Sequence, residues 1–322
     1  MISDSQKQAI ILSVEDMLAD YSNIGPGERL LLCDALFAFR ILLGRMPSYE
    51  QEIDNLFSNV TYRQFLSNLL ESHEYNGQFG FMPGGHRLMT DVNGFRFWFN
   101  SSDREMGALM ATASYEQETV KLLRSLIKPG MCCVDVGAQT GYFTCLLSSI
   151  VGQRGFVLAF EPMPKSIALL NANVRENRIE SRVRLFPVAC AEKNGELAVN
   201  VASGMAVAAS TGTHKVICVA LDDVIQEQII HFCKIDVEGH EPTVIKGMHK
   251  LLTRCHPILL TEFNQYWLNQ AGSSIPEYAK LLRSYDYNLW NATSTPTPFD
   301  ENIRYDMLSN FNVIALPQGM HI

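Results

Sequence analysis

The sequence predicts an α/β fold, a doubly wound and mostly parallel sheet, preceded by a small all-α domain. From residue 115 onward, short apolar runs typical of strands buried on both faces alternate with amphipathic helical patterns. Residues 1–76 instead show apolar residues only at helical spacing. Strands that alternate with helices imply parallel pairing through right-handed crossovers.

The composition limits the partners of this chain. Its 322 residues are 47% hydrophobic, which is enough for a large core and for more than one domain. The formal charge of −8, spread over interspersed acidic and basic residues, argues against a nucleic-acid partner, which needs a positive face. No signal peptide and no membrane-spanning apolar run is visible, and the cysteines lack zinc spacing. We therefore expect a cytoplasmic protein with reduced cysteines.

The first two segments carry no visible catalytic chemistry. Residues 1–76 form the predicted helical N-terminal domain, in which the segments 36–47, 65–66 and 72–75 resemble a helical module of the DUF4214 type. That module often accompanies carbohydrate-modifying enzymes. A helical cap or a dimerisation face explains the same pattern, so a homodimer through this domain stays open. Residues 77–114 read as a glycine-rich linker and a β-hairpin lead-in, in which Asn93-Gly94 suits a two-residue turn.

The third domain, residues 115–322, opens with a predicted helix over 115–127 and is organised around residues 131–144. A buried strand carries Asp135 near its carboxyl end, Gly137 and Gly141 follow, and a helix is predicted over 142–151. In such a unit a nucleotide-like ligand lies beyond the carboxyl end of the strand. The glycines let the backbone approach that ligand, and the helix offers unpaired N–H groups.

A second strand over 155–160 ends at Glu161-Pro162. An acidic residue at this place is where a carboxylate holds a ribose diol. Taken singly, Asp135 could cap a loop and Glu161 could be a solvated strand end. The two acids in this order favour an adenosine site.

The remaining elements continue the alternation. We predict a two-stranded hairpin insertion over 196–219, whose connection at 202–213 has the small-residue composition of a mobile loop or lid. The other predicted helices cover 164–175, 221–224, 241–252 and 275–282. The other predicted strands cover 183–188, 231–235, 257–260, 287–290 and 311–316.

Ionisable side chains cluster where the fourth and fifth strands end. Because the carboxyl ends of parallel strands face one crevice, these side chains should lie near Asp135 and Glu161. Unpaired buried charge is costly, which favours a functional site over packing. The cluster consists of Lys234, Asp236, Glu238, His240, Glu241 and Glu262.

These motifs together resemble the FkbM family of methyltransferases that use S-adenosyl-L-methionine (SAM). The resemblance covers roughly residues 86–316, and its specific part is the Asp-Val-Glu-Gly-x-Glu block at 236–241. It implies a Rossmann-like class I methyltransferase fold with a seven-stranded sheet, and O-methyl transfer to a hydroxyl of a sugar, glycan or secondary metabolite. The segments that carry it are 134–144, 160–162, 221–223, 234–241 and 261–262.

The resemblance also implies roles for individual residues. Asp135, Gly137 and Gly141 would shape the cofactor loop, Glu161 would bind the ribose hydroxyls, and Asp236 would lie beside the methionine portion and the reacting centre. Gln139 stands where relatives often have Asn. The expected cofactor site is completed by Ala138, Gln139, Tyr142, Phe143 and Pro162.

Methyl transfer to an alcohol needs alignment and a base. Positioning can contribute roughly 7–11 kcal/mol to such a displacement, and a base should take the hydroxyl proton during transfer. His240 is the natural candidate because its ordinary pKa lies near neutral pH, although it could simply cap a helix. Glu238 and Glu262 compete for this role. Asp236, Glu238 and Glu262 could instead hold Mg²⁺ or Ca²⁺, which we rank below a metal-free mechanism.

Three other functions fit the sequence less well. An NAD-dependent oxidoreductase is disfavoured because Gly137 and Gly141 lack the tight glycine spacing of the dinucleotide fingerprint and because of the Asp236 block. A non-catalytic SAM-binding adaptor is disfavoured by Asp135, Glu161 and Asp236. A nucleic-acid methyltransferase is disfavoured by the acidic charge and by the lack of an Asn/Asp-Pro-Pro-aromatic motif.

Overall fold

The computed structural model describes residues 87–100, 115–202, 205–208, 214–300 and 303–320. By its internal contacts the chain divides into two compact units, and nearly all described residues belong to the second, Asp91–Phe99 with Thr112–Ile322. The predicted helical domain, its resemblance to DUF4214 and the glycine-rich linker lie outside the described residues. Among the described helices, none is long and apolar enough to cross a membrane.

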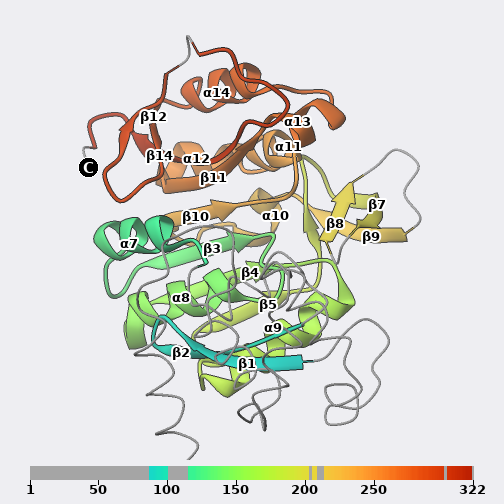
Figure 1. Cartoon of the computed structure of the whole chain (residues 1–322), viewed down its shortest axis with the longest axis vertical. Coiled ribbons are helices and arrows are strands. Elements are labelled where there is room, and N and C mark those ends of the chain that lie inside the picture. Colours follow the sequence, from blue (N-terminus) through green and yellow to red (C-terminus); the bar gives the residue numbers. More distant parts are fainter. Residues whose placement is uncertain (1–86, 101–114, 203–204, 209–213, 301–302, 321–322) are drawn as a thin grey trace, which may run out of the picture. The chain divides into compact units, whose positions relative to one another are not determined.

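The lead-in is the predicted β-hairpin. Strands β1 (Arg87–Val92) and β2 (Phe95–Asn100) pair with each other (Figure 1). Asn93 and Gly94 have φ angles of 51° and 89°. Positive φ at both central residues is what a type I′ turn requires, and Asn-Gly is the pair that adopts it most readily.

The central sheet is the predicted doubly wound, mostly parallel α/β sheet of the Rossmann-like type. Its eight strands run in the order β13-β12-β14-β11-β10-β3-β4-β5 (Figure 1). The strands from β11 to β5 are parallel, whereas β14 is antiparallel to both β11 and β12. The strand bounds are β3 Cys132–Val136, β4 Phe156–Phe160, β5 Val183–Phe186, β10 Phe232–Ile235, β11 Ile258–Asn264, β12 Tyr287–Asn291, β13 Thr297–Pro298 and β14 Asn310–Pro317.

The strand order reverses between β3 and β10. From β3 the chain moves outward through β4 and β5, and it then returns to the other side of β3 as β10 and β11. Such a switch point opens a crevice at the carboxyl ends of the strands. The predicted sheet had seven strands, and the two-residue strand β13 at the outer edge makes the eighth.

Helices cover the sheet and complete the core. One buried cluster joins β3, β10, β11 and β14 with α10, α11, α12 and α14. Helix α8 packs on β3 and β4. The helix bounds are α7 Gln117–Leu126, α8 Tyr142–Val151, α9 Pro164–Glu176, α10 Leu221–Ile225, α11 Glu241–Lys246, α12 His249–Cys255, α13 Gln265–Gln270 and α14 Ile275–Arg283, and a 3-10 turn, η1 (Gly152–Arg154), follows α8.

The structure corrects the predicted elements at two places. The helix predicted over 241–252 is broken into α11 and α12 around Gly247, whose Cβ, if present, would lie 2.0 Å from the carbonyl oxygen of Ala191. The insertion is a four-stranded sheet, β6-β9-β7-β8, and the connection predicted as a loop contains the strand β8. Its bounds are β6 Ala189–Cys190, β7 Gly195–Ala202, β8 Met205–Ala208 and β9 His214–Val219.

Candidate active site

The loop after β3 is tied to its two neighbouring strands. The N–H groups of Gly137 and Ala138 both donate to the carbonyl oxygen of Phe160, at 3.0 Å. Gly137 has a φ of 76°, and a Cβ there would lie 1.9 Å from the carbonyl oxygen of Asp236 at the end of β10. Only glycine allows this conformation together with so close an approach. The loop therefore joins the ends of β4 and β10.

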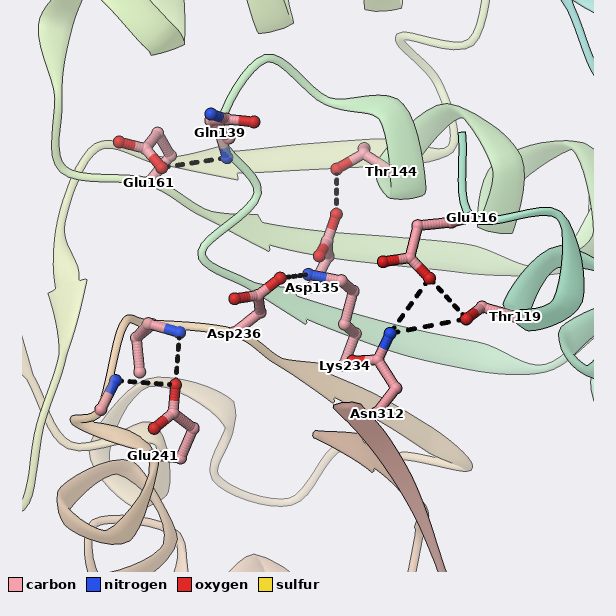
Figure 2. A network of polar contacts seen from close by, with 12 residues as sticks. Glu116, Thr119, Asp135, Gln139, Thr144, Glu161, Lys234, Asp236, Glu241 and Asn312 are labelled. Atoms are coloured by element: carbon pink, nitrogen blue, oxygen red, sulfur yellow. Dashed lines mark hydrogen bonds and ion pairs between the residues drawn. The ribbon is translucent and has the colours of Figure 1, made fainter. Parts of the chain in front are cut away.

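Glu161 holds the far side of the same loop. Its carboxylate accepts from the N–H of Gln139 at 3.0 Å (Figure 2). It also accepts from the N–H of Met163 at 2.8 Å. Gln139 has a φ of 49°, in the left-handed region that Asn enters more readily than most residues. Burial raises the pKa of Glu161 to about 7, although the two N–H donors oppose the shift. Pro162 follows it half-buried.

Asp135 presents an acceptor without a partner. It is fully buried, and its Oδ2 accepts from the hydroxyl of Thr144 at 2.6 Å (Figure 2). Among the described residues, no group donates to its Oδ1. Burial raises the pKa of Asp135, while Lys234 and Thr144 act to lower it. A buried acceptor without a donor is costly unless a ligand supplies one.

Lys234 is a buried lysine on β10, opposite Asp135 of β3 in the strand register. Its Nζ lies 2.9 Å from Oδ2 of Asp236 (Figure 2). The same atom lies 4.8 Å from the ring centroid of Phe143. Burial acts to lower its pKa, but the carboxylates of Asp236 and Asp135 outweigh burial, so the pKa is raised. Sequence reasoning assigned Lys234 no role. The available signal was a lysine inside an otherwise apolar strand.

Glu116 is a second residue that sequence reasoning missed. It precedes α7 with a φ of 52°. Its Oε2 accepts from the hydroxyl of Thr119 at 2.6 Å and from the side-chain amide of Asn312 on β14 at 3.0 Å (Figure 2). No motif marks this residue in the sequence, because its partner on β14 is 196 positions away.

Tyr142, expected in the cofactor site, lies in an aromatic cluster. It is 2% exposed and packs edge-on against Phe97, Tyr115 and Phe143. Its hydroxyl donates to the carbonyl oxygen of Tyr115 at 3.2 Å and accepts from the side-chain amide of Asn93 at 2.6 Å. The contacts shown here connect α8 to the hairpin turn and to the segment before α7.

Three carboxylates meet at the ends of β10 and β11. Oxygens of Asp236, Glu241 and Glu262 all lie within 4.8 Å of one another. The sequence suggested that Glu262 follows the fifth strand, whereas in the structure it lies within β11. Burial, together with the carboxylates of Asp236 and Glu238, raises the pKa of Glu262 to about 9. Its Oε2 is buried and has no hydrogen-bond partner among the described residues.

Glu241 takes the place that Glu238 had in the predicted cation-binding set. Its Oε1 accepts from the N–H groups of Val237 at 2.8 Å and Gly239 at 3.3 Å, so it braces the turn between β10 and α11 (Figure 2). Burial raises its pKa to about 8. Glu238 lies in that turn with a φ of 54°. The trio offers oxygens of the kind that Mg²⁺ and Ca²⁺ take, but Glu241 already serves the backbone.

His240 is the N-cap residue of α11, yet its side chain makes no capping hydrogen bond. Its Nδ1 is buried and has no partner among the described residues. Burial lowers the pKa of the imidazole. The ring is therefore neutral at neutral pH, which is the form that accepts a proton.

The chemistry of these groups fits a cationic adenosine ligand. Asp135 and Asp236 surround a single buried ammonium, and Glu161 stands at the strand end where ribose hydroxyls bind in this fold. The acceptor atom Oδ1 of Asp135 has no hydrogen-bond donor among the described residues. SAM combines adenosine with a sulfonium and an α-ammonium, so these residues would hold it.

Parts of this chain are similar to known methyltransferases. Residues 135–289 match the family described as "Methyltransferase FkbM domain". A hexuronic acid methyltransferase of Haloferax volcanii is 24% identical over 172 residues, which are 51% of this chain and 70% of that protein. A protein-L-isoaspartate O-methyltransferase of Arabidopsis thaliana is 32% identical over 85 residues, 26% of this chain, and the match spans 33% of that protein.

A solved structure is also similar to this chain. The FkbM methyltransferase of Methylobacillus flagellatus KT has a TM-score of 0.43 at 16% identity, covering 66% of this chain and 53% of that one. The matched range includes the loop after β3, the acid at the end of β4 and the carboxylates of β10 and β11. Residues 135–289 of the chain are therefore a methyltransferase domain of the FkbM type, with SAM as the cofactor.

Proposed function

We propose that the protein transfers the methyl group of SAM to a hydroxyl oxygen of a sugar, a glycan or a secondary metabolite. The observation that carries this proposal is a neutral imidazole, His240, in the turn that joins β10 to α11, next in the chain to the carboxylates at the strand ends. Of the similar proteins, one is named a hexuronic acid methyltransferase, which supports a sugar acceptor.

The reaction requires alignment and removal of one proton. When bound, SAM supplies a methyl group that is already activated by the sulfonium. The acceptor oxygen forms a bond to the methyl carbon while the carbon–sulfur bond breaks and its electron pair stays on sulfur. The hydroxyl proton must go to a base, which contributes typically 10²–10⁴-fold to such steps.

We assign the base role to His240. Its pKa is lowered by burial, so the ring is uncharged and ready to accept a proton at neutral pH. The pKa of Glu262 is raised to about 9, so this carboxyl group is protonated at neutral pH and suits hydrogen-bond donation to the acceptor better than proton abstraction. Asp236 is already engaged with Lys234, and we assign it the orientation of the acceptor.

The test is a transfer assay with isotope-labelled methyl donor against neutral sugars, uronic acids, hydroxylated metabolites and RNA. We expect an alkali-stable ether on a hydroxyl, and a loss of roughly 10²–10⁴-fold in kcat for His240→Ala with unchanged SAM affinity. His249→Ala is the matched control, because His249 is exposed on α12.

Two outcomes would contradict the proposal. An alkali-labile methyl ester would identify a carboxylate acceptor, which needs no base, and His240→Ala would then keep its turnover. SAM binding without transfer to any acceptor would favour a non-catalytic adaptor.

A further inference from the structure

We propose that Glu116 binds the α-ammonium group of SAM and so recognises the amino-acid end of the methyl donor. This goes beyond the proposed acceptor, because it concerns the donor alone and is tested by binding without turnover.

The first support is the backbone of Glu116. Its φ of 52° lies in the left-handed region, where a residue other than glycine costs of order 1–3 kcal/mol. Such conformations persist where the surroundings enforce them, and they gather at binding sites. Here the strained residue lies directly before α7 and carries a carboxylate.

The second support is the way this carboxylate is held. Thr119 on α7 and Asn312 on β14 both donate to Oε2. Within the described part of the chain, these are the hydrogen bonds found for the side chain, so the Oε1 atom is the one left to meet a ligand. The carboxylate is clamped from a helix and from the sheet at once, which fixes its direction before a ligand arrives.

The third support is its direction. Figure 2 shows the carboxylate of Glu116 on the side of Lys234 and Asp135, and its charge contributes to the raised pKa of Lys234. Asp135 is fully buried, with no donor to its Oδ1 within the described ranges.

The charges there do not balance. Asp135, Asp236 and Glu116 surround one ammonium, that of Lys234. A second ammonium, donating to Glu116 and Asp135, would reduce this excess of negative charge. The α-ammonium of SAM is a group of that kind.

The test compares three ligands by calorimetric titration of the full chain. SAM and S-adenosylhomocysteine carry the amino-acid end, whereas 5′-methylthioadenosine lacks it. We expect Glu116→Gln to weaken binding of the first two roughly 10- to 100-fold, the range for a lost hydrogen bond to a charged group, and to leave 5′-methylthioadenosine unchanged.

The choice of glutamine separates charge from structure. Its amide oxygen can still accept from Thr119 and Asn312, so the clamp survives while the charge is removed. Glu118→Gln is the control, because Glu118 is exposed and pairs with Lys121. It should bind all three ligands as the unchanged protein does.

Two results would overturn the proposal. One is an unchanged affinity of Glu116→Gln for SAM, and the other is an equal loss for 5′-methylthioadenosine, which would point to a merely structural role. If Glu116→Gln does not fold, Glu116→Asp repeats the comparison. It keeps the charge but withdraws it by one methylene, and the same selective loss for SAM is expected.

Discussion

Replacement of Lys234 by methionine tests how much one buried positive charge contributes to the stability of the fold and to SAM binding. The ammonium lies 2.9 Å from Asp236, and the two side chains are 7% and 34% exposed. Methionine keeps the length and the apolar stem of lysine but leaves Asp135 and Asp236 without their cation. We therefore expect Lys234→Met to destabilise the fold and to weaken SAM binding.

The size of the effect follows from burial. Breaking a buried ion pair costs roughly 3–5 kcal/mol. Because Asp236 is about one third exposed, we take the lower end, about 3 kcal/mol. For a domain of this size, 1 kcal/mol shifts the thermal midpoint by about 2–4 °C, so a decrease of roughly 6–12 °C is expected.

The loss of stability in Lys234→Met should depend on pH, and its direction follows from the pKa of Asp135. Burial already raises the pKa of Asp135, and Lys234 opposes that shift, so the pKa rises further in the variant. A carboxyl group with a raised folded-state pKa costs stability as pH climbs above its unfolded value of about 3.9. Because the pKa of Lys234 is raised, its ammonium stays charged at neutral pH and below, and its contribution to the free energy of unfolding is constant there. The deficit of the variant should thus be larger at pH 8 than at pH 5.

Thermal unfolding followed by circular dichroism at the two pH values measures this, with Lys246→Met as the control because Lys246 is exposed on α11. Equal thermal midpoints for Lys234→Met and Lys246→Met at pH 8 would refute the reasoning. A deficit of the same size at both pH values would refute the part assigned to Asp135.

Three further predictions concern the loop and the carboxylates. Glu161→Ala should weaken SAM and 5′-methylthioadenosine alike, by roughly tenfold or more in calorimetry, because the ribose is common to both; a loss confined to SAM would contradict the ribose role. Gly137→Ala should lower the thermal midpoint more than any surface substitution, since its Cβ would lie 1.9 Å from a carbonyl oxygen, and a midpoint like that of the unchanged protein would disprove the close approach. Methyl transfer should survive EDTA; its abolition, with rescue by Mg²⁺, would assign a cation to Asp236, Glu241 and Glu262.

Local patterns in the sequence were enough to place most elements. The bounds of α8 coincide with the predicted helix at residues 142–151, and β4 ends at Phe160 as predicted and begins one residue later than predicted, at Phe156. The Asn93-Gly94 turn followed from its two residue types alone. These features rest on apolar periodicity and on turn chemistry, both of which are properties of neighbouring residues.

Elements that depend on distant contacts escaped prediction. Helix α11 ends at Lys246, before Gly247, where the carbonyl of Ala191, far away in the chain, leaves no room for a Cβ. Strand β8 forms where small residues had suggested a loop, because β7 offers it an edge to pair with. Neither cause is visible in a short window of sequence.

For the candidate site, the sequence by itself determined which acids stand at the ends of β3, β4 and β10, because strand periodicity and glycine spacing put them there. The tertiary structure alone decided how those groups divide their roles. It showed that Lys234 pairs with Asp236, that Glu241 serves the backbone and that Glu116 is clamped by Asn312. The fold buries Lys234 opposite Asp135 of the neighbouring strand and brings Asn312 to Glu116 from 196 positions away, and so the electrostatics of the site could not be read from residue order.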